Sequence, residues 1–380
     1  MGWNAGFAIA CLFLAGAVHS NAQHISTSEW QQLVPSSQLP EQVEVQRGNN
    51  NLDLVRFENR YYFSFRTAPT HFASEKTRLY ILSSTDLESW EYEHEIHLGY
   101  DMREPRFVVF KGRLFFYFFE GGDDPLKFEP RHMHGTSLDE NGKWAPLQNI
   151  NLDGYVCWRF RVWDDRLYLS AYYGVGIYGN NHQPDLRLYE SDDGFNFKPI
   201  SEYPQVGGKG GEEGEFIFDE EGNLWATVRL EGGGAYIAYA DNTDISKWQL
   251  THTKHKYDSA LLFLHKNDVY LVARRNLDGI ADKAPKWWPE NLRKNYNLAR
   301  YSLTQKTTSL YKINKENKTA DWVMDFPSTG DTAFPGIAQI NENEFVLMNY
   351  SSDIDGPQKN WIRGQLGKTF IYWTRLTFHE

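Results

Sequence analysis

Apolar and polar positions along this chain form a short unit that occurs six times. Each unit has an apolar run, a tight polar turn and a second run rich in aromatic residues. The turns read E-N-R, K-G-R, D-D-R, E-G-N, K-N-D and E-N-E, and such residues are typical of β-hairpin turns. The copies are Asp53–Arg66, Arg103–Glu120, Trp158–Tyr173, Glu213–Arg229, Asp258–Arg274 and Asp331–Tyr350.

The spacing of the copies indicates radial repetition. Successive copies start 50, 55, 55, 45 and 73 residues apart, which is typical of a β-propeller with one blade per copy. We therefore predict an all-β, six-bladed β-propeller. A five-bladed propeller is the alternative if one copy is not a blade. Further strands follow each hairpin, and an aromatic residue ends most of these segments, at Trp90, Trp144, Phe197, Trp248 and Trp322.

Two segments depart from the repeat. The fifth copy is followed by an insertion, Leu277–Asn297, and an insertion in a repeat usually lies on one face and shapes the binding site. We find no convincing amphipathic helix, so we do not expect an α/β fold. The sixth copy has a third strand in Lys368–Phe378. We expect Gln42–Gln46 to add its outermost strand and close the ring.

The N-terminus has the features of a secretory leader. The first 22 residues carry no charge and contain an apolar stretch, Phe7–Val18, that is too short to span a membrane. Ser20–Ala22 follows with the small-x-Ala pattern of a cleavage site. We predict a signal peptide over 1–22 and one domain over 23–380, in a secreted or periplasmic protein.

Net charge, cysteine content and aromatic content limit the classes of partner that the protein is expected to bind. The net charge of −11 argues against nucleic acid and anionic membranes as main partners. Loss of Cys11 with the leader leaves Cys157 alone, without an intrachain disulfide, and we interpret it as a small buried hydrophobe. Aromatic residues make up 16% of the chain, which suits stacked sheets and also sugar-binding pockets. We expect no metal, no cofactor and a monomer.

Charged residues gather at one face of the predicted propeller. In an antiparallel blade, the start of the first strand and the end of the second lie at the same face. Arginines from several blades would meet there, and their guanidinium groups bind carboxylate or sulfate well. The catalytic candidates are Glu213, Asp53 and Asp258, and the substrate-binding candidates are Arg66, Arg159, Arg229, Arg274, His71, Glu104, Tyr172 and Asp331.

Several motifs carry a family resemblance. Ser84–Trp90 and Ser191–Phe197 have the pattern S-x-D followed by an aromatic residue, and each resembles a shortened Asp-box of sialidase-type propellers. Similar turns occur in five-bladed furanosidase-type glycosidases. The chain order that resembles secreted bacterial sialidase-like proteins is Arg159, Glu213, Arg229, Arg274 or Arg275, and Thr329–Gly336. The resemblance implies a propeller that acts on carbohydrate.

The resemblance also implies a tyrosine nucleophile late in the propeller, where this chain has Phe334. We therefore expect an exo-acting glycoside hydrolase on an anionic or terminal sugar, in which Glu213 is one catalytic carboxylate. Asp53 or Asp258 is expected opposite, with Glu104 and Asp331 as further candidates for that second carboxylate. A polysaccharide lyase that acts on uronates is one alternative, and a non-catalytic glycan-binding propeller is the other.

Overall fold

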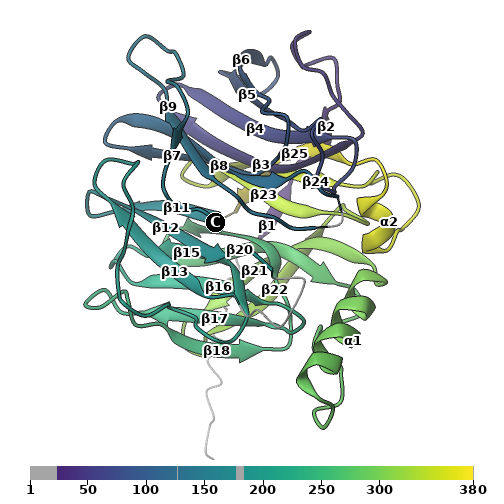
Figure 1. The fold of residues 1–380 in the computed structure, drawn as a ribbon. Coiled ribbons are helices and arrows are strands. Elements are labelled where there is room, and N and C mark those ends of the chain that lie inside the picture. The colour runs from purple at the N-terminus through teal and green to yellow at the C-terminus, as the bar shows by residue number, and fades with distance from the viewer. Residues whose placement is uncertain (1–23, 126, 177–183, 380) are drawn as a thin grey trace, which may run out of the picture.

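A computed structural model describes residues 24–125, 127–176 and 184–379 of the protein. These residues form six antiparallel sheets in a ring, as Figure 1 shows. The fold is therefore a six-bladed β-propeller, and the fold class predicted from the repeat is confirmed. The predicted signal peptide lies outside the described residues.

In each of the first three blades the strands run in chain order from the centre outward. Neighbouring innermost strands contact each other, which places the start of every blade near the central axis. The strands are β3 (Gly48–Phe57), β4 (Arg60–Ala68), β5 (Arg78–Ser84) and β6 (Glu91–Ile96); β7 (Asp101–Phe110), β8 (Arg113–Gly122), β9 (Met133–Ser137) and β10 (Gln148–Asn149); and β11 (Tyr155–Trp163), β12 (Arg166–Tyr173), β13 (Leu186–Ser191) and β14 (Lys198–Pro199).

The remaining blades continue the ring, and the innermost strand of the sixth contacts that of the first. The sixth blade takes its outermost strand from the N-terminal segment. The strands are β15 (Gly211–Phe218), β16 (Leu224–Leu230), β17 (Ala235–Ala240) and β18 (Gln249–Thr253); β19 (Asp258–His265), β20 (Asp268–Asn276), β21 (Lys306–Asn314) and β22 (Thr319–Phe326); and β23 (Ala333–Asn341), β24 (Glu344–Ser351), β25 (Phe370–Phe378) and β1 (Ile25–Thr27).

The ring closes through different residues from those predicted. Both β1 and β2 (Gln31–Val34) pair with β25, and Ile25 lies opposite Phe378. The expectation that Gln42–Gln46 forms the closing strand is wrong. Those residues form no strand: the Gln46 backbone N–H donates instead to the Thr67 hydroxyl at 2.8 Å.

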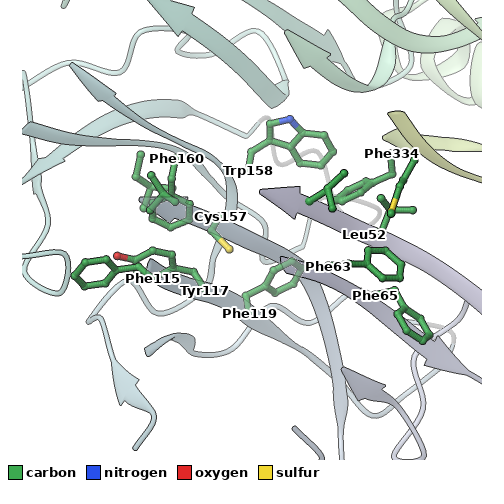
Figure 2. Packing of buried hydrophobic residues seen from close by; sticks show 14 of the residues in the cluster. Leu52, Phe63, Phe65, Phe115, Tyr117, Phe119, Cys157, Trp158, Phe160 and Phe334 are labelled. Atoms are coloured by element: carbon green, nitrogen blue, oxygen red, sulfur yellow. The ribbon is translucent and has the colours of Figure 1, made fainter. Parts of the chain in front are cut away.

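Continuous apolar runs form strands that are buried on both faces. Along β8, Phe115, Tyr117 and Phe119 pack into one core cluster, while Phe116 and Phe118 pack into another on the opposite side. This division follows from the two-residue period of a strand. Figure 2 shows the first of these clusters between neighbouring blades. Burial of such aromatic side chains dominates the energetics of a core of this kind.

Two helices lie outside the ring, in segments where the sequence shows no convincing amphipathic helix. The first, α1 (Glu290–Ser302), belongs to the insertion of the fifth blade, and the second is α2 (Trp361–Gln365). The apolar residues of α1 are sparse, and Asn297 occupies one of its buried positions. Its amphipathic pattern is weak for that reason. No helix among the described residues is long and apolar enough to cross a membrane.

Candidate active site

A β-bulge interrupts the innermost strand of every blade near its start. At each bulge the register with the second strand shifts, and a bulge of this kind re-aims the side chain that it carries. One residue from each bulge lines the same central cavity, so the blades together build a ring of six side chains. These bulge residues are Asn51, Glu104, Trp158, Glu213, Ser259 and Phe334.

Five of the six bulge residues have a positive φ angle, which residues other than glycine rarely adopt. Their φ angles are 42° at Asn51, 55° at Glu104, 48° at Glu213, 52° at Ser259 and 66° at Phe334. Each such residue costs about 1–3 kcal/mol and persists only where the surrounding structure enforces it. Strain of this kind clusters at functional sites, and here it is repeated around one cavity.

The central cavity encloses about 710 Å³. Besides the bulge residues, its wall includes Leu298, Tyr301 and Ser302 of α1 and Trp361 of α2. The insertion was predicted to shape the binding site, and its helix α1 lines the cavity. Carboxylates, cationic groups and aromatic rings all face the same space, which suits a ligand with both polar and apolar faces.

Glu213 is held in place by an ion pair and a backbone hydrogen bond. Arg229 Nη1 lies 2.5 Å from its Oε1, and the Ser259 backbone N–H donates to its Oε2 at 2.7 Å. Arg229 also pairs with the buried Glu212 at 2.8 Å. Burial raises the pKa of Glu213 above its ordinary value, while the charge of Arg229 opposes that rise.

Glu104 has a different environment. It is buried, and its Oε2 has no hydrogen-bond partner among the described residues. The Arg106 guanidinium lies 3.7 Å away. Burial raises the pKa of Glu104 to about 7, and the nearby charge of Glu213 adds to the effect. Glu104 is thus a carboxyl group that can hold a proton at neutral pH.

Aromatic rings form another part of the cavity wall. Trp158 and Phe334 meet edge to face, with ring centroids 5.4 Å apart. The Arg106 guanidinium carbon lies 4.1 Å from the Phe334 ring centroid, on the protein side of the ring. A rigid pair of rings at the wall of a polar cavity offers an apolar surface to one face of a ligand.

The structure brings six of the eleven predicted site residues to the central cavity and places the other five behind its wall. Those that line the cavity are Glu213, Glu104, Arg229, Arg274, His71 and Tyr172. Those behind the wall are Asp53, Asp258, Asp331, Arg66 and Arg159, all of them buried.

Buried ion pairs account for three of these five. Asp53 and Arg159 lie 3.4 Å apart, and Arg159 also pairs with Glu215 at 2.6 Å. Arg66 pairs with Asp101 at 2.5 Å, and both side chains are fully buried. Breaking such a pair leaves a buried charge without a partner and costs about 3–5 kcal/mol. These pairs therefore link the first blade to the second and the third, and the third blade to the fourth, around the cavity.

The other two buried carboxylates position residues of the wall. Asp258 accepts a hydrogen bond from the Tyr301 hydroxyl and so links the insertion to the fifth blade. Asp331 accepts a hydrogen bond from the Tyr350 hydroxyl at 3.0 Å, and its other oxygen lies 2.7 Å from His71 Nδ1. Burial raises the pKa of both tyrosines well above 10, so the two phenols stay protonated.

Sequence reasoning missed several residues of the wall. Trp158 and Ser259 lie directly beside the predicted Arg159 and Asp258, and each occupies the bulge in place of its neighbour. Tyr301 was missed because α1 was not predicted. A usable signal exists at one bulge, where Glu212, Glu213 and Glu215 precede the apolar end of the strand.

The fold and the position of the cavity define a six-bladed propeller with a central candidate site. No protein-family model matches the chain, and no curated protein matches it. Solved structures share the fold at low identity. A Dyadobacter fermentans protein of unknown function superposes with a TM-score of 0.62 at 14% identity, over 93% of this chain and 99% of that one.

Two sialidases superpose as well. Trypanosoma rangeli sialidase in complex with the inhibitor DANA gives a TM-score of 0.59 at 11% identity, over 87% of this chain and 55% of that one. Phage phi92 endosialidase gives 0.56 at 11% identity, over 86% of this chain and 67% of that one. At such identities the likeness shows the fold alone.

Proposed function

We propose that this protein is a glycoside hydrolase that removes an anionic or terminal sugar from a glycan. The observation that carries the proposal is the pair of carboxyl groups, Glu104 and Glu213, on bulges of the second and fourth blades in one cavity. Glycoside hydrolysis requires two carboxyl groups with different protonation states. Burial raises the pKa of both residues, but Glu213 has a close ion pair with Arg229 and a backbone donor, whereas Glu104 Oε2 has no hydrogen-bond partner among the described residues.

Glu104 serves as the general acid. Its pKa of about 7 keeps it protonated below neutral pH, so it can donate a proton to the leaving oxygen. Glu213 serves as the carboxylate that activates water or attacks the sugar, because Arg229 and the Ser259 amide stabilise its ionised form. Asp53 and Asp258, the earlier candidates for the second carboxylate, lie behind the cavity wall. Asp53 pairs with Arg159, and Asp258 accepts a hydrogen bond from Tyr301 and lies 3.7 Å from Arg229.

The cavity wall supports an acidic sugar as the substrate. Lys256 and Arg274 line the cavity on the side of the fifth blade, and Arg103 lines it on the side of the second. Guanidinium and ammonium groups at the wall of a low-dielectric cavity stabilise a bound carboxylate or sulfate. The rings of Trp158 and Phe334 offer a surface for the apolar face of the same sugar.

A tyrosine nucleophile has no support at this site. Phe334 stands where the resembled family would need that tyrosine, and it has no hydroxyl group. The nearby Tyr350 phenol is buried, donates to Asp331 and has a pKa well above 10. The chemistry proposed here therefore uses carboxyl groups alone.

The proposal is tested by incubating the purified protein with sialylated, uronate-containing and sulfated oligosaccharides and measuring new reducing ends. We expect turnover by the wild type, and a loss of at least about 100-fold in kcat for both Glu104→Gln and Glu213→Gln. Glu88→Gln, at an exposed turn, is the matched control and keeps full activity.

Three outcomes contradict the proposal in different ways. Full turnover by Glu213→Gln would exclude the assigned carboxylate. Absorbance from an unsaturated uronate would indicate a lyase instead of a hydrolase. Tight binding of an oligosaccharide by the wild type without any product would indicate a glycan-binding propeller.

A further inference from the structure

A second cavity lies between the insertion of the fifth blade and the fourth blade. It encloses about 650 Å³. Its wall combines basic, acidic and amide side chains with one indole ring, the mixture that sugar hydroxyls and sugar faces require. The lining residues include Lys209, Glu231, His252, Trp288, Lys294 and Asn297.

The second cavity adjoins the central one. Glu231 lines both cavities, and it forms an ion pair with Lys294 of α1. The same helix lines the central cavity through Tyr301 and the second cavity through Lys294 and Asn297. One helix therefore forms a wall of both cavities, and the buried Glu231 side chain lies between them.

Hydrogen bonds and close packing dock the insertion on the fourth blade. The Asn297 amide donates to the Gly232 backbone oxygen at 2.9 Å, and its oxygen accepts the backbone N–H groups of Lys283 and Ala284. A Cβ added at Gly232 would lie 2.4 Å from Lys294 Cγ, so the helix packs directly on this loop of the fourth blade. Figure 1 shows α1 beside the ring.

Aromatic rings continue outward from the second cavity over the surface of the insertion. Trp288 lines the cavity, and its ring meets those of Trp287 and Tyr296 edge to face, with centroids 6.1 Å and 5.5 Å away. The Trp287 side chain is 83% exposed. Exposed indoles that follow a polar cavity present a stacking surface, and no described residue covers this one.

We propose that the second cavity and these three rings form a distal subsite for the further sugars of the glycan whose end occupies the central cavity. This inference rests on the proposed function for the identity of the ligand as a glycan. The terminal sugar reacts between Glu104 and Glu213, and the next sugars follow α1, which lines both cavities, and stack on Trp288 and then Trp287. The protein would accordingly prefer oligosaccharides to small synthetic glycosides.

The experiment compares Trp288→Ala and Trp287→Ala with the wild type on an oligosaccharide substrate and on the aryl glycoside of its terminal sugar. We expect kcat/KM for the oligosaccharide to fall roughly three- to tenfold while that for the aryl glycoside stays unchanged, because only the longer substrate reaches the rings. Trp322→Ala removes another exposed indole, on β22, and is the matched control. Equal losses on both substrates would overturn the inference.

Binding is measured separately, so that failure of the hydrolase proposal can be recognised on its own. Native gels that contain hyaluronan, polygalacturonate or arabinogalactan are run with Glu213→Gln alone and with either tryptophan variant added. Retardation of Glu213→Gln by one polysaccharide, and its loss with Trp288→Ala or Trp287→Ala, supports the subsite even if no turnover is found. No retardation by any of the three overturns it. A change of sedimentation coefficient in Trp287→Ala also overturns it, because the rings would then be covered by a second copy.

Discussion

Replacement of Glu104 by glutamine should make the protein more stable at neutral and alkaline pH. Glutamine has nearly the shape of a protonated glutamate, and it never ionises. In the wild type the carboxylate must ionise in a buried position, where its Oε2 has no hydrogen-bond partner among the described residues. The ionised wild type therefore carries a cost that the Glu104→Gln variant lacks.

The size and sign of this effect follow from the raised pKa. Burial raises the pKa of Glu104 from 4.5 to about 7, and each pKa unit corresponds to about 1.36 kcal/mol, so the cost is about 3 kcal/mol. Because the folded pKa is the higher one, the favourable contribution of the protonated group is fully present below pH 4.5. It is lost as the pH rises through about 7.

The assay is urea unfolding followed by tryptophan fluorescence at pH values from 4 to 8.5. We expect the free energy of unfolding of Glu104→Gln, relative to wild type, to increase by about 3 kcal/mol between pH 4.5 and 8. Glu88→Gln should show a constant difference near zero. A Glu104→Gln difference that does not vary with pH would refute the assignment of Glu104 as a desolvated acid.

Three further predictions concern the frame of the cavity. Arg229→Ala removes the partner of three buried carboxylates, Glu212, Glu213 and Asp258, so the free energy of unfolding in urea should fall by about 3–5 kcal/mol. A loss below about 1 kcal/mol would contradict the ion-pair account. Gly364→Ala would place a Cβ 2.0 Å from the backbone nitrogen of Asp331, so calorimetry should show a clearly lowered Tm. An unchanged Tm would contradict this close packing. Cys157 is buried, and burial raises the pKa of its thiol above its usual range. In a Cys11→Ser background, DTNB should therefore react with Cys157 only after unfolding. Fast reaction with the native protein would contradict this, because it would show that the thiol is accessible.

The architecture was predictable because its signals are local. Each hairpin is specified by an apolar run, a turn and a second run, so six hairpins could be counted from the sequence alone. The closing strand was assigned to the wrong residues because Gln42–Gln46 and Ile25–Thr27 both read as short extended segments, and only contacts with β25 distinguish them. The helix α1 was missed because tertiary contacts of Asn297, not an apolar stripe, fix its position.

The candidate site was predictable only to within a residue or two. The central cavity opens among the strand starts that the sequence placed on one face, and Glu213 lines it. Asp258 was chosen beside the bulge residue Ser259, and Arg159 beside the bulge residue Trp158. A bulge adds one residue to a strand, and a shift of one residue exchanges the two faces of the strand. The sequence pattern does not reveal where that shift occurs.

The expectations about secretion, the single domain over 23–380 and the monomeric state remain predictions. The predicted signal peptide covers residues 1–22, which lie outside the described part of the chain. Detection of Gln23 as the first residue of the exported protein would test the signal peptide directly.

Closure of the ring by β1 and β25 sets the order in which the protein can fold. The two strands that meet there are separated by nearly the whole chain, and Ile25 pairs with Phe378. The first five blades consist of consecutive segments, so their strands can pair, and neighbouring blades can pack, before the chain is complete. The sixth must wait for Phe370–Phe378, and the entropy of joining distant segments makes this step slow. Until it is complete, β1 stays unpaired and the edge of the unfinished propeller stays open to aggregation.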